Sequence, residues 1–196
     1  MEIILHRRNT LEELAATPAQ FGVEVDIRSR GDELIIHHDP YAAGAPFEPW
    51  IAAYRPHGTL ILNVKEEGLE QRLLGLMAAH GIERFFFLDQ SFPFLVKTAR
   101  SGERRCAVRV SEYETVETAL SLAGQIDWVW VDCFTRFPLD AADARRLTDA
   151  GFKLCLVSPE LQGRPAEEAV PALRAQAEAL GAPIAAVCTK RPDLWS

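Results

Sequence analysis

Short apolar runs alternate with amphipathic stretches along the whole chain. The apolar runs are rich in Val, Ile, Leu and Phe and are bounded by Gly, Pro or charged residues, which is typical of buried β-strands. They predict eight strand positions, at Glu2–Arg7, Gly22–Arg28 (with a hairpin extension at Leu34–His38), Leu60–Lys65, Arg84–Leu88, Cys106–Val110, Trp128–Cys133, Lys153–Val157 and Ile184–Cys188. Between them, apolar residues recur about every 3.6 positions, as in helices, over Leu11–Ala16, Leu69–His80, Phe94–Ser101, Val116–Ala123, Ala141–Ala150 and Ala166–Leu180.

This alternation of strands and helices indicates an α/β fold with a parallel sheet. Eight βα units in 196 residues predict a small (β/α)8 TIM barrel with shortened βα loops, formed by one domain over residues 1–196. An open, doubly wound sheet is the alternative, but no GxGxxG or GxxxxGK loop follows any strand. The stretch Tyr41–Pro49 is rich in Ala, Gly and Pro and is predicted to be a loop over the barrel mouth.

Composition and charge narrow the classes of function. Hydrophobic residues make up 48% of the chain, and 28 acidic residues against 21 basic ones give a net charge of −7, which argues against binding to nucleic acid. No apolar run approaches the roughly 18 residues of a membrane span, and the acidic N-terminus does not resemble a signal peptide, so we expect a cytoplasmic protein. The cysteines lack the spacing of a zinc site and are predicted to be buried, reduced thiols.

Two carboxylates in the second predicted strand are the first candidates for chemistry. Glu24 and Asp26 are two positions apart and therefore point to the same side of a strand. Such a pair repels itself unless a cation or a proton lies between the two groups, and oxygen ligands suit Mg²⁺ or Ca²⁺. The run His37-His38-Asp39 follows the pair closely and supplies imidazoles for proton transfer. This region predicts metal-assisted acid/base chemistry.

Polar residues also occur where the other strands are predicted to end. In a barrel of this class the active site lies at the carboxyl ends of the strands. The residues expected there are His6, Glu24, Asp26, His38, Asn63, Lys65, Asp89, Asp132, Ser158, Thr189 and Lys190. His57 and His80, in a loop and at a helix end, are expected to be ordinary surface histidines.

The order of several short motifs resembles that of the glycerophosphodiester phosphodiesterases, a family of the phospholipase-C-like phosphodiesterase barrels. The N-terminal pieces are His6-Arg7, Asn9-Thr10-Leu11, the run from Gly22 to Asp26, and His38-Asp39-Pro40. In the middle of the chain, Leu62-Asn63-Val64-Lys65 is similar to a strand that usually reads Glu-x-Lys in the family. The last piece, Thr189-Lys190-Arg191-Pro192-Asp193, is similar to the closing Thr-Asp-Arg-Pro-Asp segment. The resemblance therefore spans nearly the whole chain.

The resemblance implies a barrel that hydrolyses a small phosphodiester, such as a glycerophosphodiester, with one divalent metal. It gives His6 and His38 the two proton-transfer roles. The metal ligands that it implies are Glu24, Asp26 and Asn63, and the phosphate contacts are Arg7, Lys65 and, in the closing segment, Lys190. The metal and the cations would stabilise the charge that develops on the phosphate oxygens.

The chain departs from the family pattern at four places. Asn63 stands where the family has its third metal carboxylate, and one neutral oxygen binds a hard cation less strongly. Arg8 stands where a glycine usually follows His-Arg, and Lys190 replaces the Asp of the closing segment. The insert that the family has after its second strand is cut to a few residues around Tyr41–Pro49, so this is a short and diverged example.

Three alternatives remain open from the sequence. A barrel that has lost catalysis could bind a phosphorylated metabolite, which the neutral Asn63 and the short insert favour. A lyase could expel the alcohol and form a cyclic phosphate. At the level of structure, Glu24 and Asp26 could instead belong to an ion-pair network with Arg7 and Arg28.

Overall fold

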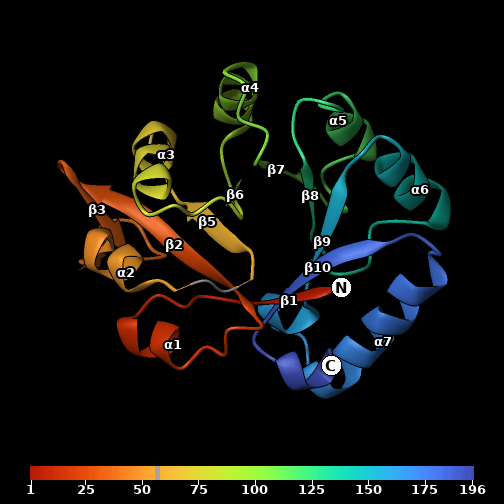
Figure 1. The fold of residues 1–196 in the computed structure, drawn as a ribbon. Coiled ribbons are helices and arrows are strands. Elements are labelled where there is room, and N and C mark those ends of the chain that lie inside the picture. The colour runs from red at the N-terminus through yellow and green to blue at the C-terminus, as the bar shows by residue number, and fades with distance from the viewer. Residues whose placement is uncertain (56–57) are drawn as a thin grey trace.

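Eight parallel strands form a curled sheet with helices around its outside (Figure 1). The structure is a computed structural model that describes residues 1–55 and 58–196, so His57 lies outside the described residues. The parallel strands are β1 (Glu2–Leu5), β2 (Gly22–Arg30), β5 (Leu60–Val64), β6 (Phe85–Leu88), β7 (Ala107–Val110), β8 (Trp128–Val131), β9 (Lys153–Val157) and β10 (Ile184–Thr189).

The strands pair in the order β6-β5-β2-β1-β10-β9-β8-β7, and every one of these pairs is parallel. At the ends of this order, β6 and the start of β7 are joined by a single isolated bridge between Phe87 and Cys106. The prediction of an α/β fold with eight parallel strands is confirmed. Closure into a complete (β/α)8 barrel stays a prediction, because the ladder narrows to that one bridge at the seam between β6 and β7.

The segment after β2 differs from the prediction. Strands β3 (Glu33–Ile36) and β4 (Ala45–Pro46) extend the sheet in antiparallel pairing, and α2 (Phe47–Ala53) follows directly. The prediction of a loop over Tyr41–Pro49 is therefore wrong for its second half. Phe47 and Trp50 are buried, and the Trp50 indole donates a hydrogen bond to the Arg8 carbonyl over 2.8 Å, so burial of the aromatic face stabilises a helix that the local composition disfavours.

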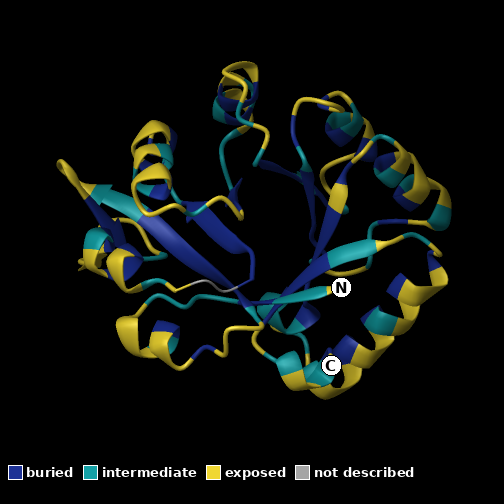
Figure 2. Cartoon of the chain, viewed as in Figure 1, coloured by how far each residue is buried: buried dark blue, intermediate teal, exposed yellow. Residues whose placement is uncertain are grey.

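The helices predicted from the 3.6-residue period are present, with ends that differ by a few residues. They turn an apolar side to the sheet and a polar side to solvent (Figure 2). Helix α1 starts with a capping box in which Thr10 and Glu13 satisfy each other's backbone N–H groups. The helices are α1 (Leu11–Ala15), α3 (Glu70–Ala79), α4 (Phe92–Arg100), α5 (Val116–Leu120), α6 (Ala141–Asp149) and α7 (Ala166–Ala179), with short 3₁₀ turns at Pro159–Gln162 and Pro192–Leu194.

Two apolar cores hold this arrangement together. The larger lies between the sheet and the helices, and the smaller fills the inside of the curled sheet. In the smaller core the rings of Phe86 and Trp128 stack with their centroids 4.6 Å apart. The thiols of Cys106, Cys133, Cys155 and Cys188 are free and buried, as the sequence predicts. None of the helices in the described ranges is long and apolar enough to cross a membrane.

Gly22, the first residue of β2, marks a close approach between strands. A Cβ there would lie 2.5 Å from the Thr59 carbonyl oxygen and 2.8 Å from Ile4 Cγ1. We therefore expect Gly22→Ala to lower the free energy of unfolding by about 1–3 kcal/mol. The matched control is Gly75→Ala in α3, where a Cβ meets open space and should stabilise the helix by about 0.5–1 kcal/mol. Urea titration of both variants checks the prediction, and an equal response at the two positions would contradict it.

Candidate active site

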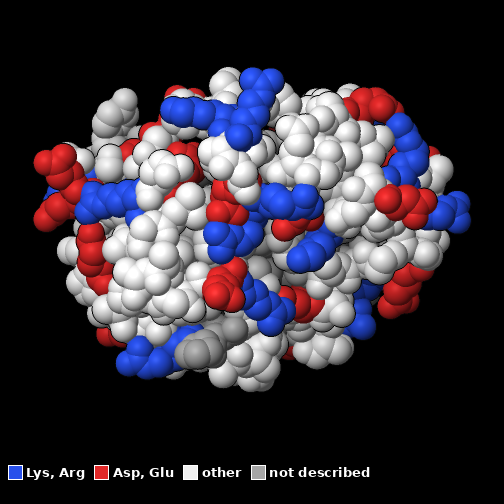
Figure 3. Space-filling view, turned by 45° about the horizontal axis from the view of Figure 1, so that its top comes forward, with Lys and Arg blue, Asp and Glu red and all other residues white. Residues whose placement is uncertain are grey.

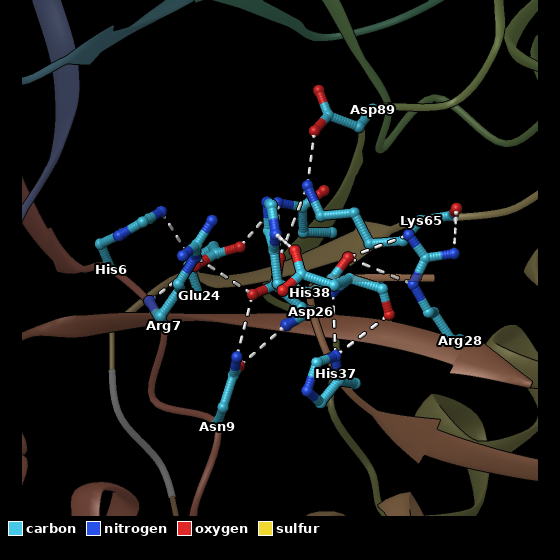
Figure 4. Close-up of polar contacts among 12 residues, drawn as sticks. His6, Arg7, Asn9, Glu24, Asp26, Arg28, His37, His38, Lys65 and Asp89 are labelled. Atoms are coloured by element: carbon cyan, nitrogen blue, oxygen red, sulfur yellow. Dashed lines mark hydrogen bonds and ion pairs between the residues drawn. The ribbon is translucent and has the colours of Figure 1, made fainter. Parts of the chain in front are cut away.

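Two fully buried carboxylates lie at the centre of the candidate site. Glu24 and Asp26 point to one side of β2, and both are 0% exposed. Asp26 is paired in register with Asn63 on β5. The Asn63 amide nitrogen Nδ2 donates to Glu24 Oε1 over 2.8 Å and to Asp26 Oδ1 over 3.2 Å. Two strands thus hold two carboxylates and one amide in contact. Glu24 and Asp26 lie on one side of β2, as strand alternation predicts (Figure 4).

The segment that follows β1 covers the other side of the pair. The backbone N–H of Arg7 donates to Glu24 Oε2 over 2.6 Å, and Arg7 Nε lies 3.4 Å from Asp26 Oδ2. Asn9 donates to Asp26 Oδ2 over 2.9 Å and accepts from the Asp26 backbone N–H over 3.0 Å. Arg7 has a φ of 51°, in the left-handed region that is unfavourable for a side chain of this size. Such conformations concentrate at functional sites, and here it aims both the N–H and the guanidinium of Arg7 at the carboxylates.

His6 lies beside Glu24 and is mostly buried. Its Nε2 is 3.8 Å from Glu24 Oε2, and its Nδ1 is buried with no hydrogen-bond partner among the described residues. Burial lowers the pKa of His6 to about 3, and the charge of Arg7 acts in the same direction. The imidazole is therefore neutral near pH 7 and able to accept a proton.

A chain of ion pairs runs from the carboxylate pair across the strand ends. Lys65 Nζ lies 3.5 Å from Asp26 Oδ1 and donates to Asp89 Oδ2 over 2.9 Å. Asp89 also pairs with Arg109, whose second nitrogen Nη1 is 3.5 Å from Asp132 Oδ2. Despite desolvation, the charges of Lys65 and Arg109 hold the pKa of Asp89 below its usual value. Asp89 has a φ of 61°, a second left-handed residue at this site.

His38, the second histidine that the family resemblance selects, lies at the more open side of the site. His38 has a side chain that is 40% exposed, and its Nδ1 is 2.8 Å from Asp39 Oδ1. Nε2 has no hydrogen-bond partner within the described part of the chain. Arg28 donates to the carbonyls of His38 (2.9 Å) and Lys65 (2.9 Å), so it ties the end of β3 to the end of β5. Of the ion-pair network that the sequence allows, the structure shows the contact of Arg7 with Asp26, whereas Arg28 contacts Glu66 and backbone carbonyls.

Lys190 follows β10 and has an exposed side chain. Its backbone N–H donates to Glu160 Oε1 over 2.9 Å, and its charge contributes to the lowered pKa of His6. The structure therefore brings Lys190 within electrostatic range of His6. The rest of the closing segment is structural, since Arg191 pairs with Glu167 and Asp193.

The proximity of the two carboxylates changes the proton affinity of Glu24. Burial, followed by the charge of Asp26, raises the pKa of Glu24 to about 7. Near neutrality the pair has a place for one proton or one cation, as the sequence predicts for two carboxylates on one face.

The pKa shifts of Glu24 and His6 have opposite effects on stability. Glu24 has a folded-state pKa of about 7, above its ordinary 4.5, so the folded state binds more protons and stability falls as the pH rises between these values. His6 has a folded-state pKa of about 3, below its ordinary 6.5, so stability falls as the pH drops through that range. In chelator-treated His6→Ala, the free energy of unfolding should fall as the pH rises from about 5 to 7. In Glu24→Gln, it should increase as the pH rises from about 4 to 6. Urea titrations at a series of pH values measure the free energy of unfolding of both variants. If it changed with pH in the same direction in both, the opposite effects of Glu24 and His6 would be contradicted.

Few residues could hold a divalent cation here. In the described ranges, no three side chains of His, Cys, Asp and Glu gather around one point. The remaining set is Glu24, Asp26 and Asn63, and Asn63 Oδ1 is buried without a hydrogen-bond partner. Rotation of the Asn63 amide by half a turn would present Oδ1 instead of Nδ2 to the carboxylates. These residues fit a hard cation, because three oxygen ligands would then face one point.

Two contributors to the site were not selected as site residues from the sequence. Asn9 was noted only as part of the motif that opens α1, yet it bonds both the side chain and the backbone of Asp26. Arg109 lies inside a predicted strand, and its alternation with Val108 and Val110 is the signal that could have placed it on the inner side. Asp89 was expected at a strand end, and it lies there.

The comparisons with known proteins agree with this fold. No family model and no curated protein sequence matches the chain. Two similar solved structures are a glycerophosphodiester phosphodiesterase from Agrobacterium tumefaciens str. C58 and a glycerophosphoryl diester phosphodiesterase from Parabacteroides distasonis. The first has a TM-score of 0.65 at 14% identity and covers 100% of this chain and 99% of that one. The second has a TM-score of 0.67 at 14% identity and covers 98% of this chain and 84% of that one.

What these two structures share with this chain is the fold, an α/β arrangement with a curled parallel sheet. The resemblance to glycerophosphodiester phosphodiesterases that the motifs indicate is thus confirmed at the level of the fold. What the site of this chain does follows from its own residues.

Proposed function

We propose that this chain is a phosphodiesterase that hydrolyses a small phosphodiester of the glycerophosphodiester kind. One observation carries the proposal: at the ends of β1, β2 and β5, a buried carboxylate pair, a neutral imidazole and two cations lie within contact of one another. Barrels of this class place their chemistry at that end of the strands. The fold shared with known phosphodiesterases supports the same reaction class.

Arg7 and Lys65 would bind the phosphate in this proposal. The Arg7 side chain is 37% exposed although its Nε is buried beside Asp26, and Lys65 Nζ has donors beyond those used by Asp89 and Asp26. Both cations are fixed before substrate binds, because the carboxylates and the chain of ion pairs hold them. Preorganised cations stabilise the charge that develops on the non-bridging oxygens without a cost of reorganisation. Lys190, which is exposed, would reach the same anion from β10.

His6 and His38 would move the protons. His6 would take the proton from the attacking water, since its ring is neutral near pH 7, although a pKa of about 3 also makes that ring a weak base. His38 is oriented by Asp39 through Nδ1, and its Nε2 would protonate the departing alkoxide. In this proposal the buried ring is the base, and the more open ring would face the side where the alcohol leaves.

A divalent cation, Mg²⁺ or Ca²⁺, would be held by Glu24, Asp26 and Asn63. When bound, it would supply positive charge to the phosphate oxygens in addition to that of Lys65 and Arg7. The raised pKa of Glu24 means that a proton competes with the cation near neutrality.

The neutral ligand Asn63 gives a direct prediction about the cation. Ligand charge tunes the affinity for hard cations, so Asn63→Asp should lower the dissociation constant for Mg²⁺ by about tenfold or more. Asn63→Leu, which removes the third oxygen, should raise it. Calorimetric titration of chelator-treated protein measures all three forms, and equal affinities would exclude Asn63 from the site.

One observation favours a second function, that of a non-catalytic barrel that binds a phosphorylated metabolite. Each carboxylate oxygen of the pair already has a nitrogen of the protein nearby, from Asn63, Arg7, Asn9 or Lys65. The protein therefore supplies a donor to every oxygen of the pair by itself, and an anion could bind at Arg7 and Lys65 with no divalent cation present.

Product analysis separates these functions. Wild-type protein is incubated with glycerophosphodiesters and simple dialkyl phosphates in the presence of Mg²⁺, Ca²⁺ or Mn²⁺, and the products are followed by ³¹P NMR. The proposal expects a phosphomonoester and a free alcohol. A cyclic phosphate as the end product would indicate a lyase. Tight binding that survives chelation, with no product under any condition, would indicate the binding protein.

A further inference from the structure

A cavity of about 550 Å³ opens at the seam between β6 and β7, next to the candidate active site. The strands share only the bridge between Phe87 and Cys106, so no ladder closes the wall beyond that point towards their carboxyl ends. A cavity of this volume falls in the range of small-molecule sites. Its lining includes Asp89, Gln90, Phe92, Leu95, Arg109 and Tyr113.

The polar floor of this cavity is continuous with the phosphate-binding cations. Asp89 accepts a hydrogen bond from Lys65 over 2.9 Å and pairs with Arg109. Lys65 in turn lies 3.5 Å from Asp26. A phosphate bound at Lys65 would therefore have the cavity directly on the side away from the carboxylate pair.

The rim of the cavity carries exposed aromatic side chains. Phe92 is 46% exposed and Tyr113 is 75% exposed, although the chain buries most of its other large apolar side chains. The Tyr113 ring lies 5.8 Å from the Phe134 ring, which also has the Arg109 guanidinium 5.9 Å from its centre. Aromatic rings at the entrance of a cavity offer stacking surface to a planar apolar group.

One lining residue also has an unused acceptor. Gln90 donates through Nε2 to Glu70 and Thr98, each over 3.0 Å, while its Oε1 is buried with no hydrogen-bond partner among the described residues. This oxygen is enclosed by the protein, so a ligand in the cavity would reach it only after the Gln90 side chain had turned. The lining thus combines aromatic surface with an ion pair.

We propose that this cavity binds one alcohol moiety of the diester and selects an alcohol that carries an aromatic ring. The proposal rests on the proposed function, in which Lys65 and Arg7 bind the phosphate. Phe92 and Tyr113 are then residues that determine specificity, and they take no part in proton transfer. Diesters of small aliphatic alcohols would leave the cavity unfilled.

Product-like monoesters test the cavity without turnover. Calorimetric titration of wild-type protein with phenyl phosphate and with methyl phosphate, in the presence of Mg²⁺, should give a dissociation constant about tenfold lower for phenyl phosphate. In the double variant Phe92→Ala/Tyr113→Ala, the difference should disappear while the affinity for methyl phosphate is kept. The matched control is Tyr41→Ala, since Tyr41 is fully exposed and lies outside the cavity lining, and it should keep the difference.

The outcomes separate a failure of the cavity proposal from a failure of the proposed phosphate site. Equal binding of the two monoesters to wild-type protein, or a preference for phenyl phosphate that survives in the double variant, would overturn the proposal and leave the phosphate site standing. If neither monoester bound, the proposed phosphate site would be wrong. The proposed function and the role of the cavity would then be wrong as well.

Discussion

Replacement of His6 by alanine should reduce the turnover of phosphodiesters by about 10²–10⁴-fold, the usual contribution of a positioned general base. His6 is the buried imidazole that is neutral near pH 7, and its Nε2 lies 3.8 Å from Glu24. The loss should fall on kcat, because Arg7 and Lys65 still bind the phosphate. Steady-state kinetics on the substrate found by product analysis measures kcat and KM separately.

The control for this variant is His80→Ala. His80 caps the end of α3, away from the strand ends, and should leave kcat unchanged. Circular dichroism of both variants shows that each is folded. If His6→Ala retained full activity, the assignment of the base would be wrong, and His38 would be the histidine to examine next.

Lys65→Met should have the largest combined effect on activity and stability. The substitution keeps the apolar stem and removes the charge that faces both Asp26 and Asp89. Asp26 is 0% exposed, and removal of one partner of a buried ion pair costs about 3 kcal/mol in the free energy of unfolding. Turnover should fall about 100-fold or more, since a preorganised contact to the phosphate oxygens is lost.

Lys97→Met is the matched control, because it removes the charge of a lysine that lies away from the candidate site. Lys97 lies on α4 with its Nζ 5.0 Å from the Phe94 ring, where a surface lysine contributes little. Urea titration and kinetics on both variants check the prediction. Equal effects at the two positions would show that the chain of ion pairs from Asp26 to Asp132 is not needed for either property.

The period-2 and period-3.6 patterns were sufficient to predict the strands and most helices. They also placed Glu24 and Asp26 on one face and put Asp89 and Asp132 at strand ends, because strand alternation is a local property of the backbone. The motif resemblance added His6 and Arg7, which lie at the end of β1 and contact the carboxylate pair.

Helix α2 was missed for a physical reason. Its first residues follow a stretch rich in Ala, Gly and Pro that predicts a loop, and the burial of Phe47 and Trp50 against distant segments stabilises the helix instead. Such tertiary stabilisation has no local signature.

The positions of donors and acceptors in the site could not be predicted from the sequence either. Asn63 was expected to offer an oxygen, whereas its Nδ2 faces both carboxylates and its Oδ1 has no partner. The pairing of Lys65 and Arg109 through Asp89 depends on the register of three strands and on the left-handed backbone of Asp89. These features emerge only when the strands lie side by side. Figure 4 shows this for Lys65 and Asp89.

The charges on one face of the molecule are mixed in sign. Acidic and basic side chains alternate over the face shown in Figure 3, with no broad area of one sign. The concentration of cations at Arg7, Lys65 and Arg109 is instead local and is matched by buried carboxylates. A single phosphate group suits such a site better than a long polyanion.

The most direct test of the central claim is calorimetric titration of chelator-treated protein with Mg²⁺, Ca²⁺ and Mn²⁺, repeated on Glu24→Ala. The claim is that the carboxylate pair and Asn63 form the cation site of a phosphodiesterase. It predicts binding of one cation per chain by wild-type protein, with release of protons near pH 7, and loss of that binding in the variant. No binding at millimolar metal, or unchanged binding in Glu24→Ala, would contradict it and leave the anion-binding barrel as the better account.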